Sequence, residues 1–217
     1  NSGLRPLSEL ARSGVITLTL VPPDADGRMD AREIERALTA RTRLVAMTHT
    51  SNVLGLEQDV AAVGAVCRRR GVLFLVDAAQ STGHLPVDMK QMGIDLLAFA
   101  GHKGMYGIAG SGGLVLNEGA DVRPLTMGGT GTESLSLEQP RFYPERLESG
   151  TLNLPAIASL AEGTNYVSEN RAAFSARLTE YTQMIVKELS ELSAVTLYSK
   201  PNPAGIVAFN LLNLPSE

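Results

Sequence analysis

A few polar side chains in the middle of the sequence have the residue types that covalent cofactor chemistry needs. The carboxylate of Asp77 and the amide of Gln80 lie three residues apart, Asn52 precedes them, and the pair His102-Lys103 follows. A lysine amine can attack an aldehyde and form a Schiff base. A carboxylate can keep a basic ring nitrogen protonated. Together these residues predict a site for a ligand that has an aldehyde and a basic ring nitrogen.

The elements expected to position these residues are three short apolar runs. The residues follow, in order, the runs Leu44–Met47, Val72–Val76 and Asp95–Phe99. Continuous apolar runs separated by helices are typical of a parallel sheet that is buried on both faces. Open α/β sheets bind ligands beyond the carboxyl ends of their strands. We therefore expect an α/β domain in which these polar side chains meet at one edge of the sheet.

Pyridoxal 5'-phosphate has the two groups that this arrangement would accept. Its pyridine nitrogen would lie beside Asp77 and become part of an electron sink, and its aldehyde would react with Lys103. Each residue also has a structural interpretation. Lys103 alone would be a surface lysine, Asp77, Asn52 and Gln80 could shape turns, and His102 could be a satisfied structural histidine.

Other patterns extend the prediction along the chain. Asp30 with Glu33 predicts the start of a helix that continues through Leu38. The remaining predicted elements are helices at Leu4–Arg12, Ala156–Ser168 and Arg171–Leu192, and strands at Val15–Val21, Gly112–Leu116, Val195–Tyr198 and Ile206–Leu211. We expect residues 1–165 to form a large cofactor-binding domain and residues 166–217 to begin a small α+β domain.

Four segments resemble, in order, the motifs of a known family. They are Thr48–Gly55, Val76–Gln80, Gly101–Gly107 and Glu148–Asn153. They are similar to motifs of the cysteine desulfurases and selenocysteine lyases, which belong to the class V aminotransferase family of pyridoxal-phosphate enzymes with fold type I. The resemblance implies an α/β fold with a largely parallel sheet flanked by helices.

The resemblance also implies roles for individual residues. Lys103 would be the Schiff-base lysine, and Asp77 the partner of the pyridine nitrogen. Gln80 would lie near the ring hydroxyl and Asn52 beside the ring. Two residues would reach phosphate groups: His102 in its own subunit and, in the other subunit of a homodimer, Thr151.

The sequence departs from the family pattern in two respects. Ala100 stands where the family commonly has a phosphate-binding hydroxyl residue. The family's ring-stacking histidine and phosphate loop would fall before Asn1, and its substrate-binding arginine and nucleophilic cysteine after Glu217. We therefore expect this chain to be a fragment, and to be inactive alone.

The resemblance implies that the full-length protein removes sulfur from L-cysteine, leaving alanine and an enzyme persulfide, and passes the sulfur to an acceptor protein. Other class V activities fit the same residues: selenocysteine lyase, aminotransferase or epimerase. A non-catalytic, dimerising fragment with the same fold is the alternative from a different class.

Composition and charge narrow the classes of partner. The formal net charge of -4 gives no electrostatic reason to expect nucleic acid, and no apolar stretch is long enough for a membrane span. The single cysteine, Cys67, shares a helical face with Val60 and Val63, so we expect it to be buried in the core. One cysteine also fits a reducing cytoplasm. His49 and His84 have no ligands at suitable spacing, and we expect no metal site.

Overall fold

The computed structural model describes residues 2–212 and 214 of the chain, and its main feature is a four-stranded sheet. The strands are β1 (Leu44–Thr48), β2 (Leu73–Asp77), β3 (Leu96–Ala100) and β4 (Gly112–Leu116), in that spatial order. The first three strands are parallel, and β4 is antiparallel to β3. All four strands confirm the predicted runs to within one residue at either end.

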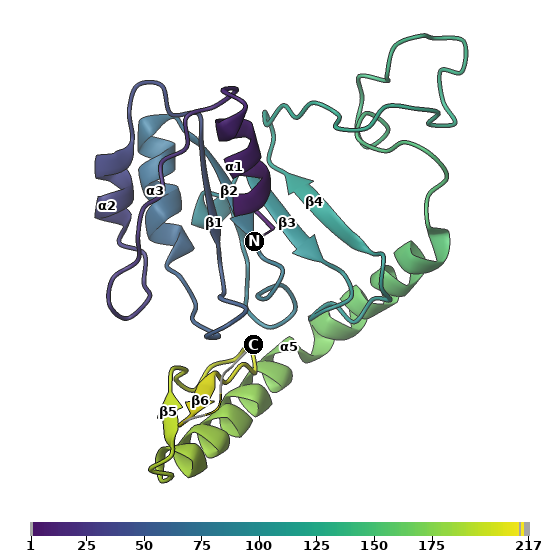
Figure 1. Ribbon diagram of the computed structural model, residues 1–217. Coiled ribbons are helices and arrows are strands. Elements are labelled where there is room, and N and C mark those ends of the chain that lie inside the picture. Colours follow the sequence, from purple (N-terminus) through teal and green to yellow (C-terminus); the bar gives the residue numbers. More distant parts are fainter. Residues whose placement is uncertain (1, 213, 215–217) are drawn as a thin grey trace.

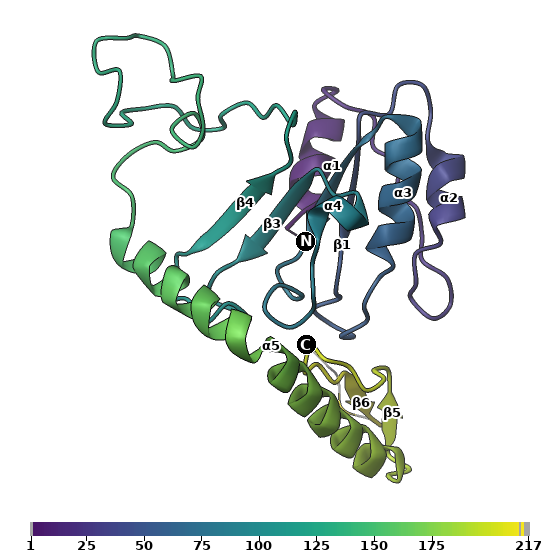
Figure 2. The same cartoon turned by 180° about the vertical axis from the view of Figure 1, so that it is seen from behind.

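Helices cover the sheet unequally. Figures 1 and 2 show α2 (Ala31–Ala37) beside α3 (Val60–Arg70), and α1 (Leu4–Arg12) on the opposite face from α4 (Met89–Met92). Helix α1 has no buried residue. Leu44 and Leu73 of β1 and β2 accordingly stay exposed on the face opposite the core. The expectation of burial on both faces is therefore wrong for this part of the sheet.

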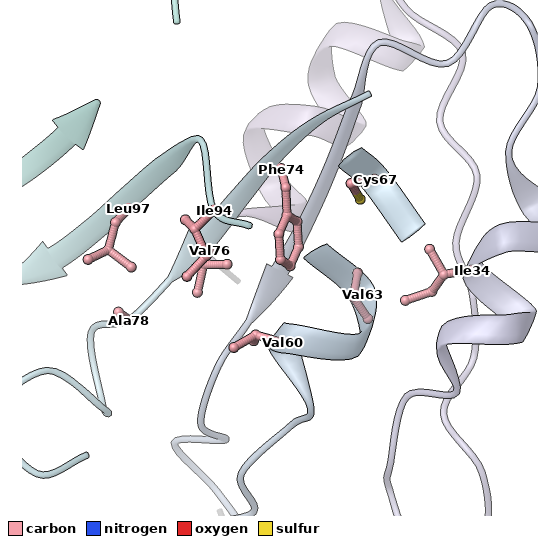
Figure 3. Close-up of a cluster of buried hydrophobic side chains, with 9 residues drawn as sticks. All are labelled: Ile34, Val60, Val63, Cys67, Phe74, Val76, Ala78, Ile94 and Leu97. Carbon is pink, nitrogen blue, oxygen red and sulfur yellow. The ribbon is translucent and has the colours of Figure 1, made fainter. Parts of the chain in front are cut away.

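The hydrophobic core lies between α3 and the sheet. Figure 3 shows its buried side chains, which come from α2, α3, β2, β3 and the adjoining loops: Ile34, Val60, Val63, Cys67, Phe74, Val76, Ala78, Ile94 and Leu97. Because their apolar surface is removed from water, they supply the main driving force for folding here. Cys67 is fully buried among them, which confirms its predicted place.

A predicted cap begins α2, and a glycine ends α3. The Asp30 side chain accepts a hydrogen bond from the Arg32 amide and caps α2. Gly71 ends α3 in the left-handed conformation, at φ 63°. The last turn of α3 carries the basic run Arg68–Arg70, and two of its side chains contact neighbouring segments. The Arg69 guanidinium lies 3.1 Å from the Glu35 carboxylate, and the Arg68 guanidinium donates to the Lys90 carbonyl.

The predicted strand Val15–Val21 is wrong. The segment has no strand assignment in the structure, and Val15 and Leu20 are exposed. A strand needs a neighbour to complete its backbone hydrogen bonds. Within residues 2–212, no other strand pairs with this segment. Its apolar alternation alone was therefore not enough to make a strand.

The C-terminal part is built on one long helix, α5 (Leu154–Ser190), and not on two. The predicted break falls at Asn170, whose side chain instead donates to the Tyr166 carbonyl within the helix. Helix α5 runs through residue 165, so the domain boundary at that residue stays a prediction. Figures 1 and 2 show α5 passing along the lower edge of the sheet to the β5–β6 hairpin.

The C-terminal hairpin is shorter than predicted. It consists of β5 (Val195–Leu197) and β6 (Phe209–Leu211). Strand β6 begins at Phe209 and not at the predicted Ile206. The Asn202 side-chain amide donates to the Ile206 carbonyl at 2.7 Å, so this carbonyl is not available for strand pairing. In the described part of the chain, no helix is both long and apolar enough to cross a membrane.

Candidate functional site

Five of the six predicted site residues, all but Thr151, lie at the ends of β1, β2 and β3 or in the connections that follow these ends. Thr48 pairs with Asp77, and Asp77 pairs with Ala98, so the three parallel strands end side by side. Helix α5 passes beneath this edge in both views (Figures 1 and 2). The sheet edge is therefore the place that this topology favours for a ligand.

Asp77 is the last residue of β2, and its backbone is held from both sides. Its carbonyl accepts from the His49 amide at 2.9 Å, and the next amide, of Ala78, donates to the Ala98 carbonyl at 2.8 Å. One carboxylate oxygen, Oδ1, accepts from the Ala79 amide. Within the described residues the other oxygen has no hydrogen bond, and neither does the half-buried side chain of Gln80. One oxygen thus orients the carboxylate, and the other oxygen can still accept a hydrogen bond from a ligand.

Lys103 and His102 lie in the tight turn that follows β3, and both side chains are exposed. The turn is closed by the Tyr106 amide donating to the Lys103 carbonyl at 3.0 Å, and by the Gly107 amide donating to the Gly101 carbonyl at 2.8 Å. Among residues 2–212 and 214, no ion pair engages the Lys103 amine. Lys103 therefore presents an exposed amine on a turn that two backbone hydrogen bonds close.

The turn after Asp77 and the turn that carries Lys103 touch through two glycines. A Cβ added at Gly83 would lie 2.0 Å from the Gly104 carbonyl oxygen, and one added at Gly104 would lie 2.4 Å from the Thr82 carbonyl oxygen. No side chain larger than hydrogen fits at either position without a shift of backbone. The turn that follows Asp77 and Gln80 is therefore in direct backbone contact with the turn that carries His102 and Lys103.

Sequence reasoning missed this contact and also the histidine beneath it. His84 is half-buried next to Gly104, and burial lowers the pKa of its imidazole below the usual value. Its Nδ1 and the Thr82 hydroxyl are buried without a hydrogen-bond partner in the described structure. The sequence feature that could have indicated the contact is the presence of Gly83 and Gly104, because backbones can approach this closely only where there is no side chain.

Asn52 and Thr151 are placed differently from each other. Asn52 lies exposed in the turn after β1, at the same sheet edge as Asp77. Thr151 lies exposed in the segment that leads into α5. The amide of the neighbouring Gly150 donates to the Gly129 carbonyl, so this segment contacts the long loop of residues 117–153, to which it belongs. The structure thus brings Asn52 to the site edge and leaves Thr151 on the 117–153 loop.

A separate cavity of about 860 Å³ lies between residues 24–28, 54–61 and 197–203. Its lining includes His49, whose Nε2 lies 3.6 Å from a Glu57 carboxylate oxygen. It includes neither Asp77 nor Lys103. The cavity is therefore not the site that the sequence predicts.

Cys67 is not part of the sheet edge. It is fully buried on α3, and burial, assisted by the negative charge of Asp95, raises the pKa of its thiol to about 11. A thiol in this state is a poor nucleophile near neutral pH.

Comparison with known proteins places the chain in a family. The family model of the class V aminotransferases matches residues 1–217. A probable cysteine desulfurase of Methanothermobacter thermautotrophicus is 36% identical over 225 residues, which cover 99% of this chain and 55% of that protein. A cysteine desulfurase of Escherichia coli is 36% identical over 203 residues, which cover 89% of this chain and 49% of that protein. The chain thus spans about half the length of these relatives.

Solved structures agree with these relatives. The apo structure of a cysteine desulfurase from Thermococcus onnurineus superposes with a TM-score of 0.84 at 33% identity, covering 98% of this chain and 55% of that one. A cysteine desulfurase from Escherichia coli shares the fold, with a TM-score of 0.85 at 24% identity over 99% of this chain and 54% of that one. The expected fold, type I of the pyridoxal-phosphate-dependent transferases, is confirmed. With its family model matched from end to end, the chain belongs to the class V aminotransferase family.

Proposed function

We propose that the full-length protein is a pyridoxal-phosphate-dependent cysteine desulfurase, and that Lys103 holds the cofactor. The observation that carries this proposal is the contact between Gly83 and Gly104, which brings the turn of Asp77 against the turn of Lys103. The relatives that are named cysteine desulfurases support the choice of L-cysteine as substrate and of a sulfur-acceptor protein as partner.

The chemistry of the side chains at the sheet edge fits this cofactor. Asp77 offers an unpaired carboxylate oxygen for a basic ring nitrogen, and Lys103 offers an exposed amine for an aldehyde. When bound, pyridoxal phosphate supplies a sink for the electrons of a breaking substrate bond. In this proposal Asp77 keeps a proton on the ring nitrogen, while Lys103 Nζ tethers the cofactor and later carries a proton.

Four other residues would contact the cofactor. Gln80 would donate to the ring hydroxyl, Asn52 would lie beside the ring, and His102 would reach the phosphate. Because Ala100 has no hydroxyl, backbone amides of the 101–107 turn would take over part of the phosphate binding. Thr151 would reach the phosphate held by a second subunit.

A homodimer is part of the proposal because of the long loop 117–153. Figure 1 shows this loop standing away from the sheet, and Leu125, Leu135 and Leu137 on it are almost completely exposed. Fully exposed leucines are costly in water, and a second copy of the chain would cover them. The same loop would then deliver Thr151 to the partner's site.

The sulfur-accepting thiol is proposed to lie outside this chain. Cys67 is buried and protonated near neutral pH, so it cannot reach or attack a bound substrate. We propose that residues 1–165 form the cofactor domain and residues 166–217 begin the small domain, in a cytoplasmic protein. The 217-residue chain alone would lack desulfurase activity.

Trapping of the cofactor tests this proposal. Borohydride reduction of the full-length protein loaded with pyridoxal phosphate should fix the label on Lys103, as measured by peptide mapping. The other lysines of this chain, Lys90, Lys187 and Lys200, are internal controls because they share its chemistry but lie elsewhere. Label on one of these three, with none on Lys103, would contradict the proposal.

A further inference from the structure

Tyr106, three residues after Lys103, has an unusual backbone. Its φ is +56°, in the left-handed region that bulky side chains rarely adopt. Its amide donates to the Lys103 carbonyl and thereby closes the turn. This conformation is sterically unfavourable for a tyrosine, whereas glycine would adopt it freely. Contacts from outside the turn must therefore stabilise it.

Two rings of helix α5 hold the tyrosine. The Tyr106 ring packs edge-on against Tyr166, with centroids 5.9 Å apart at 89°, and tilted against Phe174, at 5.7 Å. Tyr166 and Phe174 also contact each other, at 5.4 Å. We call these three residues the aromatic cluster. Such pairs have a preferred geometry, so the cluster fixes the ring in direction as well as in position.

The backbone on either side of Tyr106 is fastened to the same helix. A Cβ added at Gly163 would lie 2.1 Å from the Met105 carbonyl oxygen, so α5 and the turn are in direct backbone contact. The Ile108 amide donates to the Ser159 hydroxyl at 3.1 Å. The turn of Lys103 is thus held between α5 on one side and the Gly83 turn on the other.

The cluster adds little to the core. About half of the surface of Tyr106 and of Tyr166 is exposed, 54% and 52%, so burial of apolar area is not its main contribution. Its contacts instead act on the residue that closes the Lys103 turn. A small rotation of this turn would swing the long lysine side chain away from a cofactor at the sheet edge.

We propose that Tyr106 is a positioning residue for Lys103: the aromatic cluster holds the strained turn, and the turn aims the lysine amine at the cofactor. This inference rests on the proposed function of Lys103. It also assigns a role to α5, which carries two of the three rings and continues to the β5–β6 hairpin.

The test compares Tyr106→Ala, Tyr106→Phe and Tyr181→Ala in the full-length protein. Tyr181 is the matched control, because it is a tyrosine of α5 with a similar exposure of 50% and lies outside the cluster. The apo proteins are titrated with pyridoxal phosphate, reduced with borohydride and mapped. Tyr106→Ala should lower the labelling of Lys103 relative to the other lysines by about tenfold or more. Tyr106→Phe, which keeps the ring, and Tyr181→Ala should label as the unchanged protein does.

Two further measurements separate positioning from general damage. The thermal midpoint shows whether Tyr106→Ala is folded; if it is not, Tyr166→Ala removes a partner ring without touching the turn and should give the same loss of label. The pH dependence of the cofactor absorption band should shift in Tyr106→Ala and not in Tyr181→Ala. Normal labelling of Lys103 in folded variants that lack the cluster would overturn the inference. Absence of label on Lys103 in the unchanged protein would instead overturn the proposed function.

Discussion

Two glycine-rich regions of this molecule are built in opposite ways. In the turn of Lys103, Gly101, Gly104 and Gly107 all lie so close to neighbouring atoms that an added Cβ would clash. In the loop 117–153, Gly129, Gly131 and Gly150 have nothing within 4 Å of such a Cβ. The first region is therefore shaped by contacts within this chain. In the second region the space around these glycines is open, and we propose that a second chain covers its exposed leucines.

The comparison separates the proposed cofactor residues into two groups. Asp77, Gln80, His102 and Lys103 belong to turns that contact each other inside one chain. Thr151 belongs to the loop, and its effect would depend on a partner. Mutations in the first group should therefore affect the cofactor site of a single chain, whereas a mutation of Thr151 should affect it only in the dimer.

The largest effect is expected for Asp77→Asn. The substitution keeps the shape but removes the charge that would hold the ring nitrogen protonated, so turnover of cysteine should fall by about 100-fold or more while the cofactor still binds. Alanine release and the cofactor absorption band measure the two quantities separately. Asp59→Asn is the control, because Asp59 is a carboxylate that caps α3 and is not one of the proposed cofactor residues. Near-normal turnover in Asp77→Asn would mean that the carboxylate serves only its turn.

An intermediate effect is expected for Gly104→Ala. Its Cβ would meet the Thr82 carbonyl oxygen at 2.4 Å and the His84 ring at 2.8 Å, so the two turns would have to separate. Overpacking of this kind costs about 1–3 kcal/mol. The midpoint of denaturant unfolding should fall, and labelling of Lys103 should fall with it. Gly129→Ala is the matched control in the open loop, and a similar loss there would break the comparison.

The contrast also explains what the sequence could predict. Helix α1 and strand β4 have the predicted bounds, since each is set by local apolar spacing and flanking turn residues. The side-by-side ends of β2 and β3, after which Asp77 and Lys103 were expected to lie close together, followed from the parallel order of the strands. Local patterns could not show that the Val15–Val21 segment lacks a partner, or that α5 continues past Asn170. The left-handed Tyr106 was also invisible, because the rings that hold it come from a helix that begins 48 residues later in the sequence, at Leu154.

The smallest effect on the isolated subunit, and the sharpest test of the comparison, is expected for the loop. Leu135→Ser with Leu137→Ser changes two side chains that are fully exposed in one chain, so the fold of the subunit should be unaffected. If a second copy covers them, the dimer should dissociate at concentrations about tenfold higher or more, which sedimentation would measure. Thr151→Ala should then weaken cofactor binding in the dimer and have no effect in the dissociated subunit, whereas Asp77→Asn should lower turnover in the dimer whether or not Thr151 is present. Leu192→Ser, at an exposed leucine outside the loop, controls for loss of apolar surface. An unchanged dimer in the loop variant would show that the loop is not the interface, and that Thr151 has no partner site to reach by this route.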